Sequence, residues 1–472
     1  MFKNLCTLIF ILGFTACPMA MPASASSTPE YQVQRLKVSD NHRFLQYENG
    51  QPFFWLADTG WLLFSKLSRE EAEQYLQNRH DKGFNVIQVM VVHDLAEKNY
   101  YGNTPFINED PTQPAVTPDS SPDDSLAYDY WDHVDYIVHL AAQKGMYMAM
   151  VPVWGSAAGQ VKAQDGWADS YATWLAQRYK QNRNIIWLNG GDKKGSVLPQ
   201  IWQQLGLALD KATPDNLITF HPFGGTQSST WFHHASWLDF NMFQSGHRRY
   251  DQKRDDVPAA EWKGEDNWRY VAEDYALKPI KPTIDGEPSY ENIPQGLHDT
   301  TQPYWTAADV RRYAYWSVFA GAFGHTYGNN AVMQMHKPDS GKGSYGVRDY
   351  WDHAMNDEGA REMKYLKQLM LSRPFFERRP AQSLLAGENG QKYNHIVATR
   401  GKNYAFFYTY TGRPFEVDLS KMPAGLIVAS WYSPRDGHTL DAGVFNTSGI
   451  QYFHPPGTEK EGNDWVLILD RI

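Results

Sequence analysis

Cysteine is almost absent from this chain of 472 residues, because its only two copies, Cys6 and Cys17, lie close to the N-terminus. Beyond residue 17 the sequence therefore offers no disulfide, no thiol nucleophile and no cysteine-ligated metal site. A basic surface is lacking too, since the net charge is −9 and no stripe of lysine or arginine occurs. A nucleic-acid partner is therefore not expected.

Several motifs of enzyme chemistry are also missing. None of the 16 histidines forms a His-x-His pair, and neither His-Glu-x-x-His nor a Gly-x-Ser-x-Gly elbow occurs. The first apolar strand runs into Ala57-Asp58-Thr59-Gly60-Trp61, which is not a glycine-rich phosphate loop. We expect neither a metal nor a cofactor, and a Ser-His-Asp mechanism is disfavoured.

Long apolar runs are confined to the N-terminus. Residues 5–14 are apolar, follow the single charge of Lys3, and precede Ala23-Ser24-Ala25, which has the small residues of a cleavage site. The run is too short to span a bilayer as a stable helix, so residues 1–25 are predicted to be the signal peptide of an exported protein. Phe14-Thr15-Ala16-Cys17 also resembles a loose lipobox that would lipidate Cys17. A secreted or periplasmic protein and an outer-surface bacterial lipoprotein both stay open, and the oligomeric state is not predicted.

From about residue 50 to 372, short apolar runs alternate with amphipathic stretches, which indicates parallel βαβ units. The expected strands are residues 53–57, 86–92, 146–153, 185–188, 217–220, 238–243, 282–284 and 323–327. Eight such units predict a (β/α)₈ TIM barrel over residues 31–375, with a doubly wound open sheet as the alternative. A long polar loop, residues 96–124, interrupts the alternation and hints at a closed pocket and exo action.

The pattern changes after Arg373-Pro374. Short β-rich runs separated by turn residues predict a C-terminal antiparallel β-sandwich over residues 380–472. Near the start of the α/β region, Asn49-Gly50 predicts a hairpin turn that adds short strands to the barrel.

Two carboxylates each lie shortly after an expected apolar strand, and glycine residues separate each carboxylate from its strand. Asp192 comes after Asn189-Gly190-Gly191, and Glu287 comes after Asp285-Gly286. They follow the fourth and seventh expected strands, so they should meet at the end of a barrel where active residues gather. A pair of carboxylates is what hydrolysis of a glycosidic bond requires, and their separation distinguishes retaining from inverting enzymes. The sequence does not give that separation. Structural roles also stay open, with Asp192 as a helix cap and Glu287 as a surface loop residue.

Other polar or aromatic side chains at expected strand ends are candidates for substrate contacts. A buried polar group, or one that orients the two carboxylates, is the alternative for each. Trp154, together with Trp61, is a candidate platform for a sugar ring, with core packing as its alternative. The substrate-binding candidates are Asp58, His93, Asp94, Trp154, His221, Gln244, His325 and Tyr327.

Four segments together resemble the apiosidase-like glycoside hydrolases (family 140 and relatives). They are Phe54-Trp55-Leu56-Ala57-Asp58-Thr59, Gly83-Phe84-Asn85-Val86-Ile87, Trp187-Leu188-Asn189-Gly190-Gly191-Asp192 and Asp285-Gly286-Glu287-Pro288. The C-terminal part resembles a domain type labelled as collagen-binding. The two resemblances cover nearly all of the chain beyond the signal peptide.

The resemblance implies a retaining barrel enzyme in which Asp192 is the acid/base and Glu287 the nucleophile. Many members of the wider clan have Asn-Glu at the end of the fourth strand, where this chain has Asn189-Gly190-Gly191-Asp192. The family's known activity implies a carbohydrate substrate, apiose on pectin side chains of the plant cell wall. A barrel that binds a polysaccharide or a matrix protein without catalysis is the alternative function.

Overall fold

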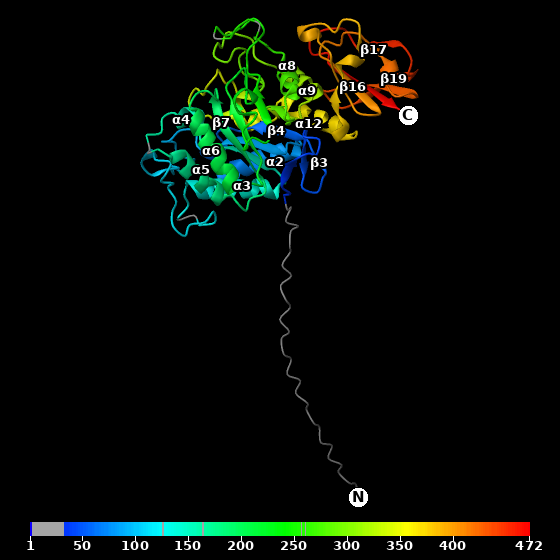
Figure 1. Cartoon of the computed structure of the whole chain (residues 1–472). Coiled ribbons are helices and arrows are strands. Elements are labelled where there is room, and N and C mark those ends of the chain that lie inside the picture. Colours follow the sequence, from blue (N-terminus) through cyan, green and yellow to red (C-terminus); the bar gives the residue numbers. More distant parts are fainter. Residues whose placement is uncertain (2–32, 125–126, 163–164, 256, 260) are drawn as a thin grey trace.

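The computed structural model describes Met1 and residues 33–124, 127–162, 165–255, 257–259 and 261–472. An α/β unit, blue to yellow in Figure 1, lies beside a smaller C-terminal unit of strands, orange to red. The predicted signal peptide and Cys17 lie outside the described residues. Within the described residues, no helix is both long and apolar enough to cross a bilayer.

A six-stranded parallel sheet forms the centre of the α/β unit. Its strand order is β12-β4-β5-β6-β7-β8, and each neighbouring pair is parallel. Every residue of β4, β5, β6, β8 and β12 is buried, as expected where helices cover one face and a core fills the other. The strands are β4 (Trp55–Thr59), β5 (Val86–Met90), β6 (Tyr147–Val151), β7 (Ile185–Lys193), β8 (Ile218–Pro222) and β12 (Gly324–Tyr327).

A second sheet has the order β11-β10-β9, in which β10 (Asn241–Gln244) and β11 (Thr283–Asp285) are parallel and β9 (Thr226–Gln227) is antiparallel. Backbone hydrogen bonds join it to the first sheet on both sides. Asp239 N–H donates to Ile218 O at 2.9 Å, and Phe323 N–H donates to Thr283 O at 3.1 Å. All eight predicted strands are therefore present, within a few residues of their expected bounds.

Helices connect the strands in the predicted alternation. A capping box at Ser68 and Glu71 begins α2 (Arg69–Asp81): the Ser68 side chain accepts from Glu71 N–H, and the Glu71 side chain accepts from Ser68 N–H. The longer helices are α2 (Arg69–Asp81), α3 (Tyr130–Gln143), α5 (Trp167–Arg178), α6 (Pro199–Ala212), α8 (Asn267–Ala276), α9 (Ala307–Ala320) and α12 (Glu358–Leu371). The short ones are α1 (Leu63–Lys66), α4 (Gly155–Ala158), α7 (Ser229–Phe232), α10 (Asn330–Met333) and α11 (Trp351–Ala354). A 3₁₀ turn, η1 (Ile107–Glu109), lies in the long loop after β5.

A small antiparallel sheet precedes β4. It contains β1 (Leu36–Val38), β2 (Leu45–Tyr47) and β3 (Pro52–Phe53), and the predicted turn at Asn49-Gly50 joins the last two. The Tyr147 hydroxyl at the start of β6 donates to Gln34 O. The sheet therefore lies at the end of the α/β unit where the parallel strands begin.

The C-terminal unit is antiparallel, as predicted. One sheet has the order β13-β15-β16-β21-β18-β19 and a smaller one the order β14-β17-β20. The first contains β13 (Arg379–Pro380), β15 (Val397–Arg400), β16 (Tyr404–Thr409), β18 (Leu426–Tyr432), β19 (Thr439–Asn446) and β21 (Trp465–Arg471). The second contains β14 (Leu385–Ala386), β17 (Phe415–Asp418) and β20 (Ile450–Phe453). The 3₁₀ turns of this half are η2 (Phe375–Glu377), η3 (Gln382–Leu384), η4 (Lys392–Asn394) and η5 (Leu419–Lys421).

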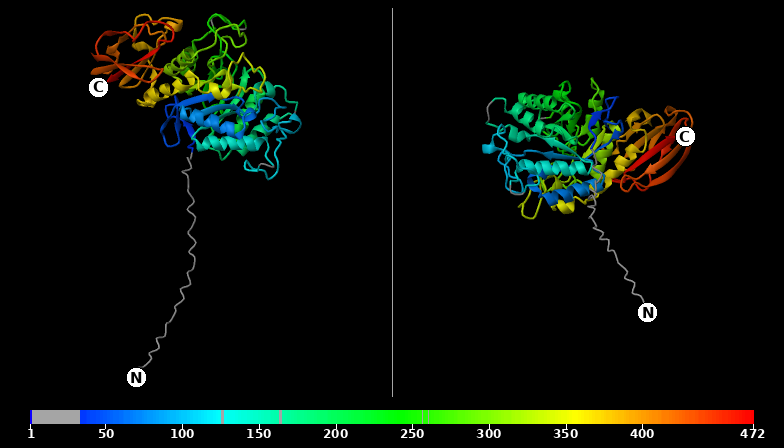
Figure 2. Two further views of the ribbon diagram at one scale, coloured as in Figure 1. Left: turned by 180° about the vertical axis from the view of Figure 1, so that it is seen from behind. Right: turned by 90° about the horizontal axis from the view of Figure 1, so that it is seen from below.

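Strand β16 contributes side chains to two hydrophobic cores, one on each of its faces. Successive side chains of a strand point to opposite faces, and in β16 both faces are buried. Phe407 packs into the core of the C-terminal unit, whereas Phe406 and Tyr408 belong to the core of the α/β unit. The Tyr408 ring stacks on Tyr315 of α9 with centroids 4.8 Å apart. Figure 2 shows the two units side by side, seen from behind and from below.

A buried ion network also spans this junction. Arg311 of α9 pairs with Glu362 of α12 at 2.5 Å and with Asp464 of the C-terminal unit through two bonds of 3.0 Å. Arg435 adds a second cation to Asp464 at 2.8 Å. The side chains of Arg311, Glu362 and Asp464 are at most 5% exposed. Because a buried charge needs a partner, the network ties the two units together.

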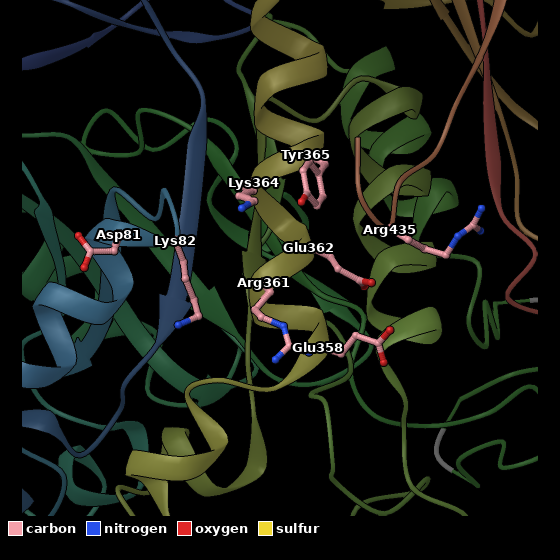
Figure 3. Close-up of a pocket in the computed structure, with 8 residues that line it drawn as sticks. All are labelled: Asp81, Lys82, Glu358, Arg361, Glu362, Lys364, Tyr365 and Arg435. Atoms are coloured by element: carbon pink, nitrogen blue, oxygen red, sulfur yellow. The ribbon is translucent and has the colours of Figure 1, made fainter. Parts of the chain in front are cut away.

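A cavity of about 440 Å³ lies along α12 between α2 and Arg435 of the C-terminal unit (Figure 3). Charged side chains of both signs line it, and neither Asp192 nor Glu287 is among them. Its lining residues are Asp81, Lys82, Glu358, Arg361, Glu362, Lys364, Tyr365 and Arg435.

We predict that Arg311→Ala lowers the free energy of unfolding by about 3–5 kcal/mol, because it leaves Glu362 buried without its cation. Chemical denaturation would measure the loss. The matched control is Arg373→Ala, whose ion pair with Asp470 joins the same two units but is about a third exposed. That pair should contribute about 0–1 kcal/mol. Equal losses in the two variants would contradict the role of the buried network.

Candidate active site

Glu287 lies two residues beyond β11 and is buried, with 7% of its surface exposed. Two imidazoles contact its carboxylate: His247 Nε2 lies 3.1 Å from Oε1, and His221 Nε2 lies 3.2 Å from Oε2. Burial raises the pKa of Glu287, but the neighbouring His221 and His247 outweigh it and hold this pKa below its ordinary value. The carboxylate is therefore ionised over the whole physiological range.

The backbone fixes the orientation of His247. Tyr290 N–H lies 3.4 Å from His247 Nδ1, so Nδ1 is the acceptor and Nε2 carries the proton that is donated to Glu287. The Tyr290 hydroxyl in turn accepts a hydrogen bond from Trp61 Nε1 at 3.1 Å. A buried layer of Trp61, Tyr290 and the two histidines thus surrounds one side of the carboxylate.

Asp192 stands on a bulge at the end of β7. The pairing of β7 with β8 advances from Gly190 opposite His221 to Lys193 opposite Pro222, so two residues of β7 are left without a partner. Gly190, Gly191 and Asp192 have φ of 95°, 101° and 54°, all in the left-handed region. The bulge turns the chain sharply and brings Asp192 to the end of the strand beside Glu287.

Both glycines of the bulge are required by space as well as by φ. A Cβ on Gly190 would lie 2.7 Å from His221 O, and one on Gly191 would lie 2.6 Å from Trp154 Cε3. Neither neighbour can move easily, because one is backbone and the other belongs to a packed indole. The Gly-Gly-Asp sequence is therefore a geometric requirement of this strand end.

The surroundings of Asp192 oppose its ionisation. Burial is the largest cause, and the charge of Glu287 adds to it, so the pKa of Asp192 is raised above its ordinary value. His221, His247 and a hydrogen bond with Gln244 lower the pKa, but by less. Asp192 Oδ1 is buried and has no hydrogen-bond partner within the described part of the chain. Two carboxyl groups with pKa values moved in opposite directions are a common arrangement for acid–base chemistry.

An aromatic wall adjoins the carboxylates. Trp154, at the N-terminus of α4, is half-buried, and its ring centroid lies 5.3 Å from that of Trp61 and 5.8 Å from that of His221. Trp61 is 4% exposed, so Trp154 offers the accessible indole of the pair. An apolar ring face beside two carboxylates suits the C–H face of a sugar.

Comparison with known proteins identifies the family of each domain. The family described as apiosidase-like, catalytic domain, matches residues 39–377, and the "Putative collagen-binding domain of a collagenase" matches residues 379–470. The chain belongs to the apiosidase-like family. No match was found among curated proteins.

Two solved structures are similar over almost the whole apiosidase-like chain. One, described as a glycoside hydrolase, is 47% identical with a TM-score of 0.87, and the match covers 94% of this chain and 98% of that one. The other, a glycoside hydrolase family 5 protein from Bacteroides vulgatus ATCC 8482, is 45% identical with a TM-score of 0.88 and covers 94% of each chain. The apiosidase-like chain is therefore a glycosidase.

Three predicted substrate-binding residues lie on the wrong face of their strands. Asp58 is fully buried against α2, where Tyr75 donates a hydrogen bond of 2.6 Å to it and Arg79 pairs with it at 3.2 Å. Tyr327, opposite Asp58 in the sheet, donates to Glu291 Oε2 at 2.5 Å. His325 precedes Tyr327 by two residues, so it shares that face. Asp58 and Tyr327 are thus engaged with side chains other than the two carboxylates, and both ring nitrogens of His325 are buried without a hydrogen-bond partner among the described residues.

Of the remaining substrate-binding candidates, two lie beside the carboxylates and two lie on the surface after β5. His221 and Gln244 face the two carboxylates, as described above. His93 and Asp94 are exposed at the end of β5, where Asp94 Oδ1 caps the turn by accepting from Ala96 N–H. Among the described residues, no group of three or more His, Cys, Asp or Glu is placed to hold a metal ion.

Three residues near the two carboxylates were not predicted from the sequence. His247 lies three residues after the end of β10, and Tyr290 lies three residues after Glu287, so both are in loops. Tyr345 is half-buried, and the charges of Asp192 and Glu287 contribute to raising its pKa, after burial as the main cause. It lies in a loop that contains Gly341, Gly343 and Gly346. That glycine-rich loop beyond the last strand was the one available signal.

We predict that Gly191→Ala lowers the rate of sugar release about 10²-fold, because the new methyl group displaces Trp154 or Asp192 by about an ångström. Gly145→Ala is the control, since Gly145 also has a positive φ, of 69°, but open space around it. Both variants should lose about 1–2 kcal/mol of stability from the left-handed backbone, and Gly191→Ala should lose about 1–3 kcal/mol more from its contact with Trp154. Full activity of Gly191→Ala would show that the bulge is not needed for the chemistry.

Proposed function

We propose that the protein is a retaining glycosidase in which Glu287 is the nucleophile and Asp192 the acid/base. The observation that carries this proposal is the meeting of two carboxyl groups at the strand ends, with His221 and His247 in contact with the buried Glu287 and Asp192 on the bulge of β7 beside it. Membership of the apiosidase-like family supports the retaining rather than the inverting reaction. Glu287 is kept ionised by His221 and His247, as a nucleophile must be, whereas burial and the charge of Glu287 keep a proton on Asp192.

The reaction then has two steps. Glu287 attacks the anomeric carbon and forms a glycosyl ester while the bond to the leaving oxygen breaks, and Asp192 gives its proton to that oxygen. In the second step Asp192, now ionised, takes a proton from water, and the resulting hydroxide displaces Glu287 from the anomeric carbon. Both carboxyl groups return to their starting protonation states.

The proposal includes a closed (β/α)₈ barrel and a C-terminal sandwich. The hydrogen bonds that join the two sheets on both sides support closure, since they continue the order of the eight strands around a ring. Asp192 and Glu287 then follow the fourth and seventh strands, at the end where active residues of such barrels gather. The two sheets of the C-terminal unit, with a shared core of their own, support the sandwich.

We propose a plant cell-wall polysaccharide as the substrate, with an apiose-bearing pectin side chain as the first choice. Membership of the apiosidase-like family and the accessible Trp154 beside the carboxylates support a carbohydrate. We also propose export through the N-terminal signal, with or without a lipid on Cys17, because an extracellular polysaccharide cannot be reached from inside the cell.

A panel of plant cell-wall glycans tests this function, with released sugars separated and identified by chromatography. Release of a sugar whose anomeric configuration equals that of the substrate would support the retaining mechanism, and inversion would exclude it. Binding of glycans without any release would instead favour a non-catalytic binding protein.

We predict that Asp192→Asn and Glu287→Gln each lower kcat at least 10²–10⁴-fold, the usual contribution of a positioned acid or base. Melting temperatures close to that of the parent would show that both variants are folded. Asp215→Asn is the control, because this carboxylate is 73% exposed and pairs with Arg35, which is not a residue of the site. Turnover at the parental rate in either variant would exclude the assignment.

We predict a bell-shaped pH profile of kcat/KM with its maximum on the acid side of neutral. The alkaline limb follows Asp192, whose raised pKa keeps its proton below that pKa and loses it as the pH rises. The acid limb follows Glu287, whose lowered pKa keeps its charge until the pH falls through that pKa. His247→Ala removes a group that lowers the pKa of Glu287, so the acid limb should move to higher pH. An acid limb at its parental pH in this variant would show that His247 does not control the ionisation of Glu287.

A further inference from the structure

The C-terminal unit contacts the loop that carries His247. This loop, which we call the β10 loop, comprises residues 245–255 and follows strand β10. Tyr393 of the C-terminal unit lies against it, with its ring centroid 5.7 Å from that of Tyr250. Lys392 Nζ lies 5.2 Å from the centre of the same Tyr250 ring. The two domains therefore meet at a segment whose other end reaches the catalytic carboxylates.

Glu265 connects Tyr393 to the β10 loop through a fully buried carboxylate. The Tyr393 hydroxyl donates to Glu265 Oε1 at 2.9 Å, and Tyr250 N–H donates to the same oxygen at 3.3 Å. Arg312 of α9 pairs with the other oxygen at 2.6 Å. One carboxylate thus receives a bond from each domain and from the loop between them.

Aromatic rings hold Arg312 and so fix Glu265. The Arg312 guanidinium carbon lies 4.8–5.1 Å from the ring centres of Tyr313, Trp316, Tyr393 and Tyr410, two of which belong to the C-terminal unit. Its side chain is fully buried, so the cation depends on these rings, on Glu265 and on Asp309 of α9, whose Oδ1 lies 3.6 Å from the guanidinium. The C-terminal unit therefore supplies part of the environment that keeps this ion pair in place.

From Tyr250 the β10 loop leads back to His247. Gly296 N–H and Trp305 Nε1 donate to His247 O at 2.7 and 3.2 Å, and Arg249 and Gln252 bind Gln295 beside them. The His247 ring then contacts Glu287 at 3.1 Å. The other groups that face Glu287, namely Asp192, His221, Tyr290 and Tyr345, come from the α/β unit alone.

We propose that the C-terminal domain is a structural part of the active site, in which Tyr393 is a positioning residue that holds the β10 loop, and with it His247, against Glu287. A catalytic group must be held to within a fraction of an ångström, and neighbouring hydrogen bonds supply that rigidity. The proposal rests on the function proposed above, because it concerns the same carboxylate.

The test compares Tyr393→Phe and Tyr393→Ala with Tyr432→Phe. The first loses only the hydroxyl bond to Glu265, and the second also loses the ring against Tyr250 and Arg312. Tyr432→Phe is the matched control, because the Tyr432 hydroxyl crosses the same domain junction but donates to Tyr365 O on α12. His247→Ala serves as the reference for complete loss of the contact with Glu287.

Two measurements are made on the full-length protein. Hydrogen exchange of peptides within residues 245–255 reports the order of the β10 loop without any substrate. The pH profile of kcat/KM reports the contact of His247 with Glu287. We expect faster hydrogen exchange of the β10 loop in both Tyr393 variants. We also expect the acid limb of the pH profile to move to higher pH in both. In Tyr393→Ala the shift should be about one pH unit, which corresponds to about tenfold lower kcat/KM on the acid side. Tyr432→Phe should leave both readouts at their parental values.

Parental exchange and a parental acid limb in both Tyr393 variants would overturn the proposal. Equal changes in the Tyr432 variant would overturn it too, because they would show general loosening of the junction. If the parent protein releases no sugar from any glycan, the proposed function fails, and the exchange of the β10 loop still decides whether Tyr393 positions it.

Discussion

The charge of Glu287, stabilised in a buried place by two imidazoles, is the interaction on which the rest of the site depends. An isolated carboxylate with this burial would take up a proton, and both carboxyl groups would then be neutral. With His221 and His247 in contact, Glu287 stays negative, and its field is one of the two causes that keep the proton on Asp192. The charge of the first carboxyl group thus adds to the effect of burial on the second.

The bulge of β7 determines where that second group stands. A regular strand would place residue 192 one step along the pleat, on a face set by the alternation of side chains. Three consecutive residues in the left-handed region break the alternation, and the close approach of His221 O and Trp154 leaves room only for glycine before Asp192. The backbone of the bulge, and not the regular pleat of β7, therefore sets the position of the Asp192 carboxyl group.

The eight strands and both carboxylates could be predicted from the sequence, because apolar runs between amphipathic stretches and acids after glycine are local patterns. The face on which each side chain lies could not. Parallel strands here are buried on both sides, so the sequence around Asp58 or Tyr327 shows no alternation from which to choose the inner face. His247, Tyr290 and Tyr345 were missed for another reason: they lie in loops whose return toward the strand ends depends on contacts distant in sequence, such as that of His247 O with Gly296.

The double burial of strand β16 bears on how such proteins can be recombined. The boundary between the two family domains falls at residues 377–379 of the sequence, but the apolar packing is continuous across it. A C-terminal domain grafted onto an unrelated partner would present Tyr404, Phe406 and Tyr408 to water, a flat aromatic surface prone to self-association. The catalytic domain alone would lose the cover of α9. The two domains therefore form one packing unit, and a chimaera must exchange both domains together or redesign the interface between them.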